Sequence, residues 1–373
     1  MDFNFTEEQE QLRDTVRRWV SKDYTFERRN HIVADGKGKG GFDAGVYQEL
    51  AGLGLSALAV DEAHDGLGMG AVESMVVMEE LGRGMVMEPL AQTLIAARVL
   101  SAYADSAVQK AWLPKIASGE ALVSLAYQES AARYKLDACE ATASKASEGY
   151  ALTGQKTCVL AGDACLAYLV TAKLDGKIAM FLVEASAAKA EGYGQQDGSR
   201  AARVSFNQAA ATLVSTEGVA ALELAVDTGI AALCAEGLGV MDMYLQLTVD
   251  YMNTRKQFGQ TLASFQALRF RIADVKMQVE LARSMSYYAT LKLDSPAPER
   301  RAAMARAKYQ LGQSMRFVSQ NCMQLHGGIG MTDEYHGSHA FKKLTQLEMT
   351  FGDSLHHLGE VSHRMQDTAG VFS

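Results

Sequence analysis

Long stretches without proline constrain the fold of this chain more than any other feature of its sequence. The 373 residues include only four prolines, at positions 89, 114, 296 and 298. Proline interrupts helices more strongly than any other residue, and the chain is rich in alanine, leucine, methionine and glutamate, which favour helix. The sequence therefore predicts a mostly α-helical protein with several long helices.

Helical patterns occupy the first part of the chain, up to about residue 122. Thr6 and Gln9 have the spacing of a capping box, and apolar residues recur after them at helical intervals. Four further helical patterns follow, over residues 43–54, 70–84, 90–104 and 107–117. Residues 1–122 are therefore expected to form an N-terminal helical domain.

Short β-rich runs replace the helical patterns in the middle of the chain. The runs are Val123–Tyr127, Tyr150–Thr153, Lys156–Leu160, Ala167–Ala172, Ile178–Val183 and Ala202–Phe206. Turn residues such as Asp175-Gly176 separate them, and no helical pattern lies between them. This arrangement favours a small antiparallel β barrel or sandwich over a βαβ unit. The expected central domain spans residues 123–213.

Helix returns from residue 214 to residue 373. The expected helices are Leu222–Asn253, Phe265–Leu293, Glu299–Leu325 and Phe341–Asp367. Four long helices joined by short connections are typical of an antiparallel bundle. The sequence therefore predicts a C-terminal four-helix bundle.

Charge and cysteine usage argue against several classes of function. The formal net charge of −8 disfavours binding to nucleic acid or to an anionic membrane surface. The five cysteines are scattered without a C-x-x-C pair, which predicts reduced thiols and no metal site. The sequence shows neither a signal-peptide pattern nor an apolar run that predicts a membrane span. We therefore expect a cytoplasmic protein without membrane insertion.

The glycine-rich segment Gly66-x-Gly68-x-Gly70 has spacing that could suggest a nucleotide-binding loop. A phosphate loop of that kind follows a strand and opens a helix within a βαβ unit, and neither pattern surrounds this segment. We expect a loop with a structural role.

Several local signals resemble, in their order along the chain, those of acyl-CoA dehydrogenases. Two resemble family signatures, at residues 251–259 (YMNTRKQFG) and 324–332 (QLHGGIGMT). Two others, at residues 110–114 (KAWLP) and 154–156 (GQK), resemble the link into the family's β domain and a hairpin within it. The resemblance covers nearly the whole chain. It implies an N-terminal helical domain, a central β domain and a C-terminal four-helix bundle, usually assembled as a dimer of dimers.

The resemblance also implies FAD as the cofactor. The residues that match the family's contacts to the diphosphate and adenosine of a neighbouring subunit's FAD are Arg255, Phe258, Gln266, Gln324, Gly327 and Gly328. An arginine suits a pyrophosphate, and glycines let a cofactor approach the backbone. The alternative is that Arg255 is only a cation at a helix C-terminus and that the two glycines form an ordinary turn.

The carboxylate that the family reaction requires has no counterpart in this sequence. It removes the α-proton of an acyl-CoA thioester while the β-hydride goes to the flavin. Counted from the two signatures, the family's two positions for this glutamate hold Phe351 and Gly229. Asp353 lies two residues beyond the first position and is the candidate substitute; the alternative is that it is a carboxylate at a helix N-terminus. No catalytic residue is assigned.

The segments that match the family's flavin-ring contacts are altered as well. Residues 128–135 (QESAARYK) replace a Thr-Glu-Pro segment and the Gly-Ser-Asp that follows it, and Cys158-Val159-Leu160 replaces Trp-x-Thr. In this respect the chain resembles the small subunit of heteromeric acyl-CoA dehydrogenases of the pimeloyl-CoA dehydrogenase kind. That resemblance implies an acyl-CoA substrate, a paralogous partner in an α2β2 tetramer, and electron-transfer flavoprotein or another electron acceptor. The alternative is a self-sufficient homotetramer that uses Asp353 as its base.

Overall fold

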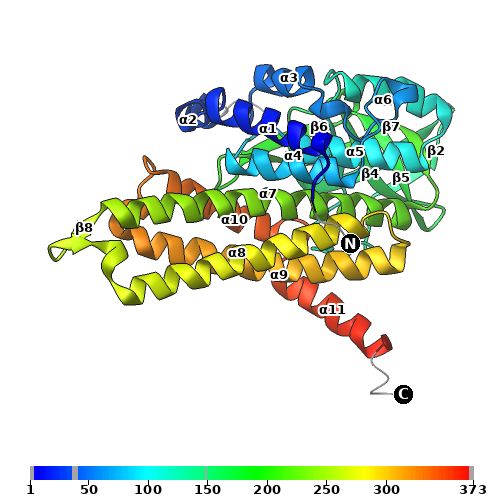
Figure 1. Cartoon of the computed structure of the whole chain (residues 1–373). Coiled ribbons are helices and arrows are strands. Elements are labelled where there is room, and N and C mark those ends of the chain that lie inside the picture. Colours follow the sequence, from blue (N-terminus) through cyan, green and yellow to red (C-terminus); the bar gives the residue numbers. More distant parts are fainter. Residues whose placement is uncertain (1–3, 36–40, 148, 369–373) are drawn as a thin grey trace. The chain divides into compact units, whose positions relative to one another are not determined.

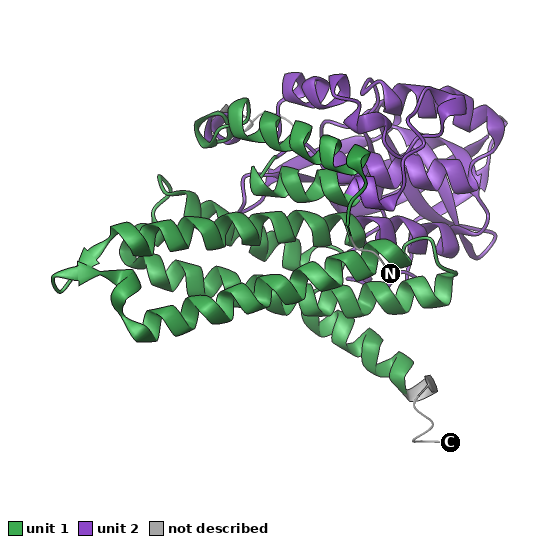
Figure 2. Cartoon of the chain, viewed as in Figure 1, with its two compact units in different colours: residues 1–29, 75–86, 230–373 green, residues 30–74, 87–229 purple. Residues whose placement is uncertain are grey.

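The structure, a computed structural model, describes residues 4–35, 41–147 and 149–368 (Figure 1). The chain forms two compact units (Figure 2). Unit 1 comprises residues 1–29, 75–86 and 230–373, and unit 2 comprises residues 30–74 and 87–229. The N-terminal third of the chain therefore contributes to both units. The boundaries predicted at residues 122 and 213 remain a prediction.

Unit 2 is built on a small β barrel. Its strands are β1 (Val123–Ala126), β2 (Thr142–Lys145), β3 (Tyr150–Leu160), β4 (Ala167–Leu174), β5 (Lys177–Glu184), β6 (Lys189–Gly194) and β7 (Arg200–Ser215). Hydrogen bonding runs from β4 through β5, β7, β3 and β2 and back to β4, which closes a ring, while β1 joins β4 and β6 joins β7. The predicted small barrel is confirmed. Two pairings, β1 with β4 and β2 with β4, are parallel rather than antiparallel.

Three helices of unit 2 accompany the barrel: α3 (Ala44–Gly52), α5 (Leu90–Tyr103) and α6 (Ser106–Ala117). A side chain of α5 joins the helix to the sheet, because the Gln92 amide oxygen accepts a hydrogen bond from the Leu125 backbone N–H at 2.9 Å. The hydroxyls of Tyr47 in α3 and Thr93 in α5 are 2.7 Å apart. These helices occupy the segments in which the sequence predicts helix.

The glycine-rich segment in unit 2 is a tight loop around the short 3-10 helix η2 (Glu62–His64). A Cβ atom on Gly66 would lie 1.9 Å from the carbonyl oxygen of Val60. The Gly68 N–H also donates to this oxygen at 2.8 Å. Close approach of two backbone segments therefore explains the glycine at position 66 without a phosphate.

Unit 1 contains the helical bundle. Its helices are α1 (Glu7–Lys22), the end of α4 (Ala71–Arg83), most of α7 (Gly218–Thr254), α8 (Gln266–Lys292), α9 (Ala297–His326), α10 (His336–Met349) and α11 (Ser354–Thr368); α2 (Phe26–Asp35) begins in unit 1 as well. The capping box at the start of α1 is present, with Thr6 and Gln9 each accepting a hydrogen bond from the backbone N–H of the other. An 18-residue stretch of α7 has a mean hydropathy of 1.6, which a membrane span could also have, but 83% of that stretch is buried inside the protein.

Helices α4 and α7 approach each other unusually closely at two glycines. A Cβ on Gly82 of α4 would lie 2.1 Å from the carbonyl oxygen of Glu236 in α7. Reciprocally, a Cβ on Gly239 of α7 would lie 1.9 Å from the carbonyl oxygen of Glu79 in α4. Each helix therefore lacks a side chain where the backbone of the other passes, and any larger residue at either position would force the two helices apart.

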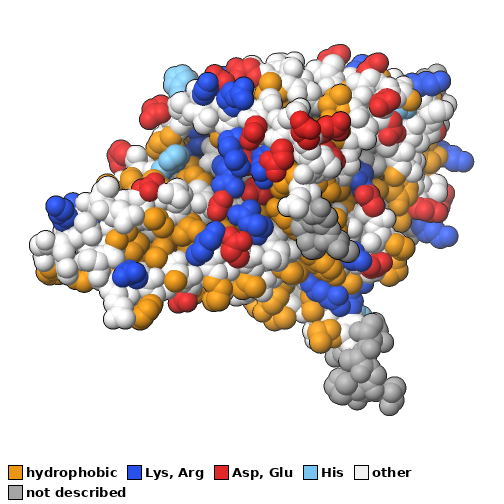
Figure 3. Space-filling model, viewed as in Figure 1, with side chains coloured by type: hydrophobic (Ala, Val, Ile, Leu, Met, Phe, Trp, Pro, Cys, Tyr) orange, Lys and Arg blue, Asp and Glu red, His pale blue; other side chains and the backbone are white. Residues whose placement is uncertain are grey.

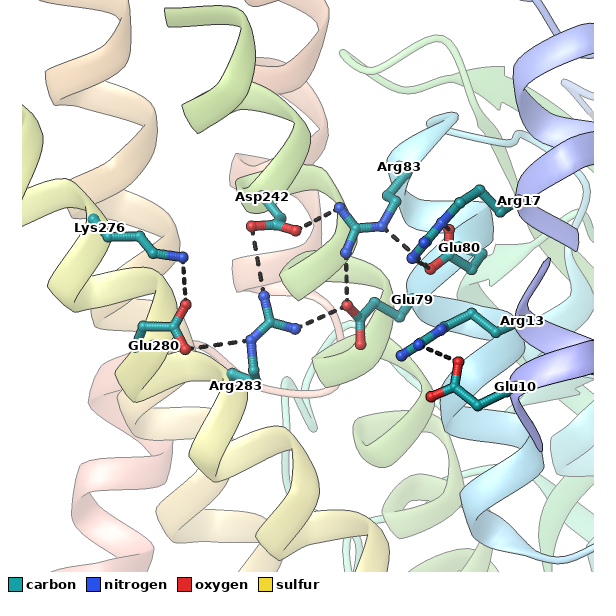
Figure 4. Close-up of polar contacts among 10 residues, drawn as sticks. All are labelled: Glu10, Arg13, Arg17, Glu79, Glu80, Arg83, Asp242, Lys276, Glu280 and Arg283. Carbon is teal, nitrogen blue, oxygen red and sulfur yellow. Dashed lines mark hydrogen bonds and ion pairs between the residues drawn. The ribbon is translucent and has the colours of Figure 1, made fainter. Parts of the chain in front are cut away.

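An ion-pair network surrounds this crossing (Figure 4). Glu79 of α4 accepts from Arg83 of the same helix at 2.9 Å and from Arg283 of α8 at 3.0 Å. Both arginines also pair with Asp242 of α7. Glu80 extends the network to Arg17 of α1 at 2.6 Å. Because these groups are partly buried, they are less screened than surface pairs and help to fix α4 on the bundle.

The last predicted helix, Phe341–Asp367, is wrong as a single element. The structure contains two helices, α10 and α11, separated at residues 350–353. Phe351 and Gly352 have positive φ angles of 58° and 107°, which no helix can continue through. The break therefore falls at the first of the two positions that motif spacing predicts for the family's glutamate.

Candidate functional site

The first signature forms a hairpin at the end of α7. Arg255 is the first residue after this helix, and its N–H donates to the Tyr251 carbonyl at 2.8 Å. Strands β8 (Lys256–Gln257) and β9 (Gln260–Thr261) then pair around Phe258 and Gly259. Both turn residues have positive φ, 51° and 82°, as a two-residue hairpin turn of type I′ requires.

Phe258 lies at the tip of this hairpin with 92% of its surface exposed. Its ring meets the edge of Phe265 at a centroid distance of 6.3 Å. Positive φ is uncommon for a bulky residue and is tolerated here because the hairpin requires it. The hairpin therefore presents an aromatic side chain to solvent.

The second signature ends α9 in an open turn. Gly327 has a φ of 64°, and the short 3-10 helix η5 (Gly327–Met331) follows directly. A Cβ atom on Gly327 or on Gly328 would meet nothing within 4 Å. The positive φ of Gly327 favours glycine at that position, whereas nothing inside the chain requires glycine at position 328, and the space in front of both residues is open.

The two signatures and the start of α8 enclose a cavity of about 650 Å³ within unit 1. Four of the six predicted cofactor contacts line it: Arg255, Gln324, Gly327 and Gly328. The other two, Phe258 and Gln266, are not among its lining residues. Arg271 of α8 lines the cavity and was not predicted. Its position one helical turn after Leu268, which also lines the cavity, is the signal that could have identified it.

The chemistry of this cavity suits an anionic nucleotide. Among the described residues neither Arg255 nor Arg271 has an ion-pair partner, whereas the arginines in Figure 4 are paired with carboxylates. Leu262 and Leu268 give the same cavity an apolar wall. The residues present therefore fit the adenosine diphosphate end of FAD, with cations for the phosphates and an apolar surface for the base.

His326, between Gln324 and the glycines, is a packing residue. It is 3% exposed, and its Nδ1–H donates to the Cys322 carbonyl at 2.8 Å. Its ring lies 4.7 Å from that of Tyr251 and 5.0 Å from that of Tyr335. Burial lowers the pKa of His326, so the imidazole is neutral at physiological pH.

Phe351, the residue at the first position that motif spacing predicts for the family's glutamate, is 7% exposed. Its carbonyl accepts a hydrogen bond from His357 Nε2 at 3.0 Å. The buried Lys308 of α9 donates to the carbonyls of Leu347 at 2.9 Å, Glu348 at 2.7 Å and Gly352 at 3.1 Å. Three acceptors match the three N–H bonds of an ammonium group, which holds both ends of the break in place.

The two carboxylates near Phe351 make structural contacts. Asp353 precedes the first residue of α11, and its Oδ1 accepts from the His356 backbone N–H at 2.8 Å, the bond of a helix N-cap. Glu348 accepts from the backbone N–H and the hydroxyl of Ser354 at 3.0 and 2.7 Å. Gly229, at the second position of the missing base, is buried within α7.

The altered flavin-ring segments lie in unit 2. Glu129, in the segment 128–135, is buried and pairs with Lys156 of β3 at 2.6 Å, so this pair stabilises the segment against the barrel. Cys158 is exposed with a φ of 55°, and the Tyr193 hydroxyl donates to its sulfur at 3.4 Å. Leu160 has no polar group to offer a flavin. These positions thus present a thiol and an apolar side chain.

Comparison with known proteins agrees with this geometry. Residues 6–120 match the acyl-CoA dehydrogenase N-terminal domain, and residues 216–366 match the acyl-CoA dehydrogenase C-terminal domain. The acryloyl-CoA reductase (NADH) of Anaerotignum propionicum is 26% identical over 96% of this chain and 94% of its own length.

Two solved structures are similar over nearly the full length. A variant of the Tcur3481-Tcur3483 steroid ACAD has a TM-score of 0.88 at 27% identity, over 97% of this chain and 99% of that one. The ChsE4-ChsE5 complex from Mycobacterium tuberculosis gives 0.87 at 25% identity, over 99% and 100%. The chain belongs to the acyl-CoA dehydrogenase family of FAD-dependent oxidoreductases.

Proposed function

We propose that this chain is the subunit of a heteromeric acyl-CoA dehydrogenase that lacks the catalytic base and completes the FAD site of a partner subunit. The observation that carries the proposal is the environment of Phe351. The side chain at the first base position cannot accept a proton, and the nearby carboxylate of Asp353 is engaged in capping α11. The second base position holds a glycine, so proton abstraction falls to another chain.

The proposed reaction divides between the two subunits. The partner would supply the carboxylate that removes the α-proton of an acyl-CoA thioester, and FAD, when bound, would supply the acceptor for the β-hydride. This chain contributes Arg255 and Arg271 toward the diphosphate of that FAD, together with the open backbone at Gly327 and Gly328. Its own part is to bind and orient the cofactor. The electron acceptor of the assembled enzyme would be electron-transfer flavoprotein or another acceptor.

This chain has one surface that would contact the adenosine end of FAD and another that would contact the flavin ring, here called the adenosine wall and the ring wall. The difference between these two walls supports the division. The adenosine wall, in unit 1, has cations, glycines and an apolar surface around one cavity. The ring wall, in unit 2, has Cys158 and Leu160 where the family has an aromatic ring and a hydroxyl. A site made from two copies of this chain would combine one suitable wall with one unsuitable wall. A site whose ring wall comes from an intact paralogue would have two suitable walls.

Exposed apolar surface is a second support for an assembly. Apolar side chains gather on the face of the bundle seen in Figure 3. On α8 alone, Phe270, Met277 and Leu281 are 62%, 54% and 43% exposed, and their spacing places them on one side of the helix. Apolar patches of this kind mark contacts between chains. One of the similar structures, that of ChsE4-ChsE5, is likewise a complex.

The test is the number of flavins per assembly. An α2β2 tetramer with an intact paralogue has two sites of each kind, so we expect two FAD per tetramer rather than four. The chain is purified alone and with a paralogue that keeps the glutamate and the Thr-Glu-Pro segment, and FAD absorbance is compared with protein concentration. The chain alone should be flavin-poor and inactive toward acyl-CoA. Four FAD per tetramer, or a yellow and active homotetramer, would show that the proposal is wrong.

A further inference from the structure

We propose that Arg271 is a second cation of the anion-binding cavity and that, together with Arg255, it makes this wall selective for a diphosphate over a monophosphate. The inference deepens the proposed function, on which it rests, by assigning a residue that determines which part of the cofactor this chain recognises. Arg271 lies outside both signatures, on the second turn of α8.

Unbalanced positive charge at the cavity is the first argument. The chain has 44 acidic residues against 36 lysines and arginines, yet none of the described residues that line this cavity is acidic. Two arginines line it, from the end of α7 and from α8. Like charges that share a cavity repel each other, and a ligand with two negative charges removes that repulsion.

The absence of other partners is the second argument. Within the part of the chain that the structure describes, neither Arg255 nor Arg271 forms an ion pair or a side-chain hydrogen bond. Arg83 and Arg283 in the same unit are both held by Glu79 and Asp242. The two guanidinium groups of the cavity therefore keep their donors available to a ligand.

The shape of the cavity supports a nucleoside diphosphate. A volume of about 650 Å³ lies in the range of ordinary small-molecule sites. Leu268 and Ile329 line the cavity and offer an apolar surface to a base, while the open backbone at Gly328 leaves room beside them. The ligand chemistry is thus adenosine diphosphate, either free or as one end of FAD.

The experiment measures binding of ADP, AMP and adenosine to the full chain by isothermal titration calorimetry. The variant is Arg271→Gln, and the matched control is Arg269→Gln. Arg269 lies on the same helix and is also exposed, but two residues along a helix point about 200° apart, and Arg269 does not line the cavity. Circular dichroism establishes that both variants are folded.

We expect Arg271→Gln to weaken ADP binding about tenfold, since a hydrogen bond to a charged group contributes at least about that factor. AMP binding should weaken less, adenosine binding should not change, and Arg269→Gln should match the wild type. Equal losses for ADP and adenosine would mean that Arg271 stacks on the base and would overturn the proposal. Unchanged ADP binding in Arg271→Gln would overturn it as well.

A second experiment distinguishes free ADP from the ADP end of FAD as the ligand. It also tests the role of Arg271 separately from the proposed function. The α2β2 complex is prepared with Arg271→Gln, and its FAD content is measured after dialysis. Reduced FAD retention beside weaker ADP binding supports the proposal. A wild-type chain that binds no ADP overturns the role of Arg271, while the proposed function stands or falls with the count of two FAD per tetramer.

Discussion

Asp353 offers a direct comparison between a structural and a catalytic carboxylate. Its Oδ1 accepts a hydrogen bond from the His356 N–H at 2.8 Å. Replacing an N-cap residue by alanine typically costs about 1 kcal/mol of stability, whereas asparagine caps a helix nearly as well as aspartate. The lost charge near the helix N-terminus adds a cost of about 0.3–1 kcal/mol at most. Asp353→Ala should therefore destabilise the chain by about 1–2 kcal/mol, and Asp353→Asn by about 0.3–1 kcal/mol.

If Asp353 is instead the catalytic base, both variants should reduce turnover strongly and to a similar extent. General base catalysis typically contributes about 10²–10⁴-fold, so asparagine and alanine would both reduce turnover by that factor. Urea denaturation of the chain measures the stability differences, and acyl-CoA turnover of the α2β2 complex measures the rate. We expect Asp353→Asn to keep the rate within a few-fold of wild type. A loss of a hundredfold or more with an unchanged urea midpoint would refute the structural role and favour the self-sufficient enzyme.

Three further predictions concern binding and stability. Arg255→Ala should lower FAD occupancy of the complex, because a charge-assisted bond contributes about 1.5–3 kcal/mol, and unchanged FAD affinity would contradict its assignment. Gly66→Ala should destabilise the chain in urea, since its Cβ would lie 1.9 Å from the Val60 carbonyl, but should leave ADP binding unaltered. Burial raises the pKa of Asp242, but the positive charges of Arg83 and Arg283 outweigh burial, so the pKa is lowered overall. The ionised Asp242 therefore stabilises the folded chain at neutral pH, and this stabilisation is lost as the pH falls below about 4. The stability difference between wild type and Asp242→Asn should shrink over that range; a difference that is constant between about pH 7 and pH 3 would argue against the ion pairs.

Much of this fold follows from patterns that are local in sequence. The capping box at Thr6 and most helices lie where the sequence predicts them. The sequence predicts two separate strands where the structure has the single long strand β3. The prediction divides it at Gly154, because a glycine within a strand pattern often marks an interruption. A Cβ on Gly154 would lie 2.5 Å from the Ala141 side chain, so the residue marks a close contact inside the barrel. Strands β2 and β6 were missed because they are exposed and lack an apolar alternation.

The break before α11 and the second cavity arginine show where local patterns fail. Gly352-Asp353 is a local stop and start signal, and it agrees with the alternative that Asp353 is a carboxylate at a helix N-terminus, although the helical pattern around it predicts a single helix. The contacts that fix the break come from Lys308, more than forty residues earlier than Gly352, and no short-range pattern includes that distance. Arg271 was not predicted because its place in the cavity depends on the end of α9 lying beside the start of α8. Motif spacing predicted four of the residues that line the cavity, whereas only the packed bundle shows that Arg271 lines it as well.

The reciprocal glycines at the crossing of α4 and α7 have a consequence for how the molecule opens. Neither helix can slide along the other without bringing a side chain against the facing backbone, so residues 75–86 are fixed in register on the bundle. In hydrogen-exchange terms, the amides of α4 around Gly82 should exchange together with those of α7 around Gly239, as one cooperative unit. A segment from the first quarter of the chain should therefore unfold together with a helix from its second half, so that local opening follows this crossing rather than the order of the sequence.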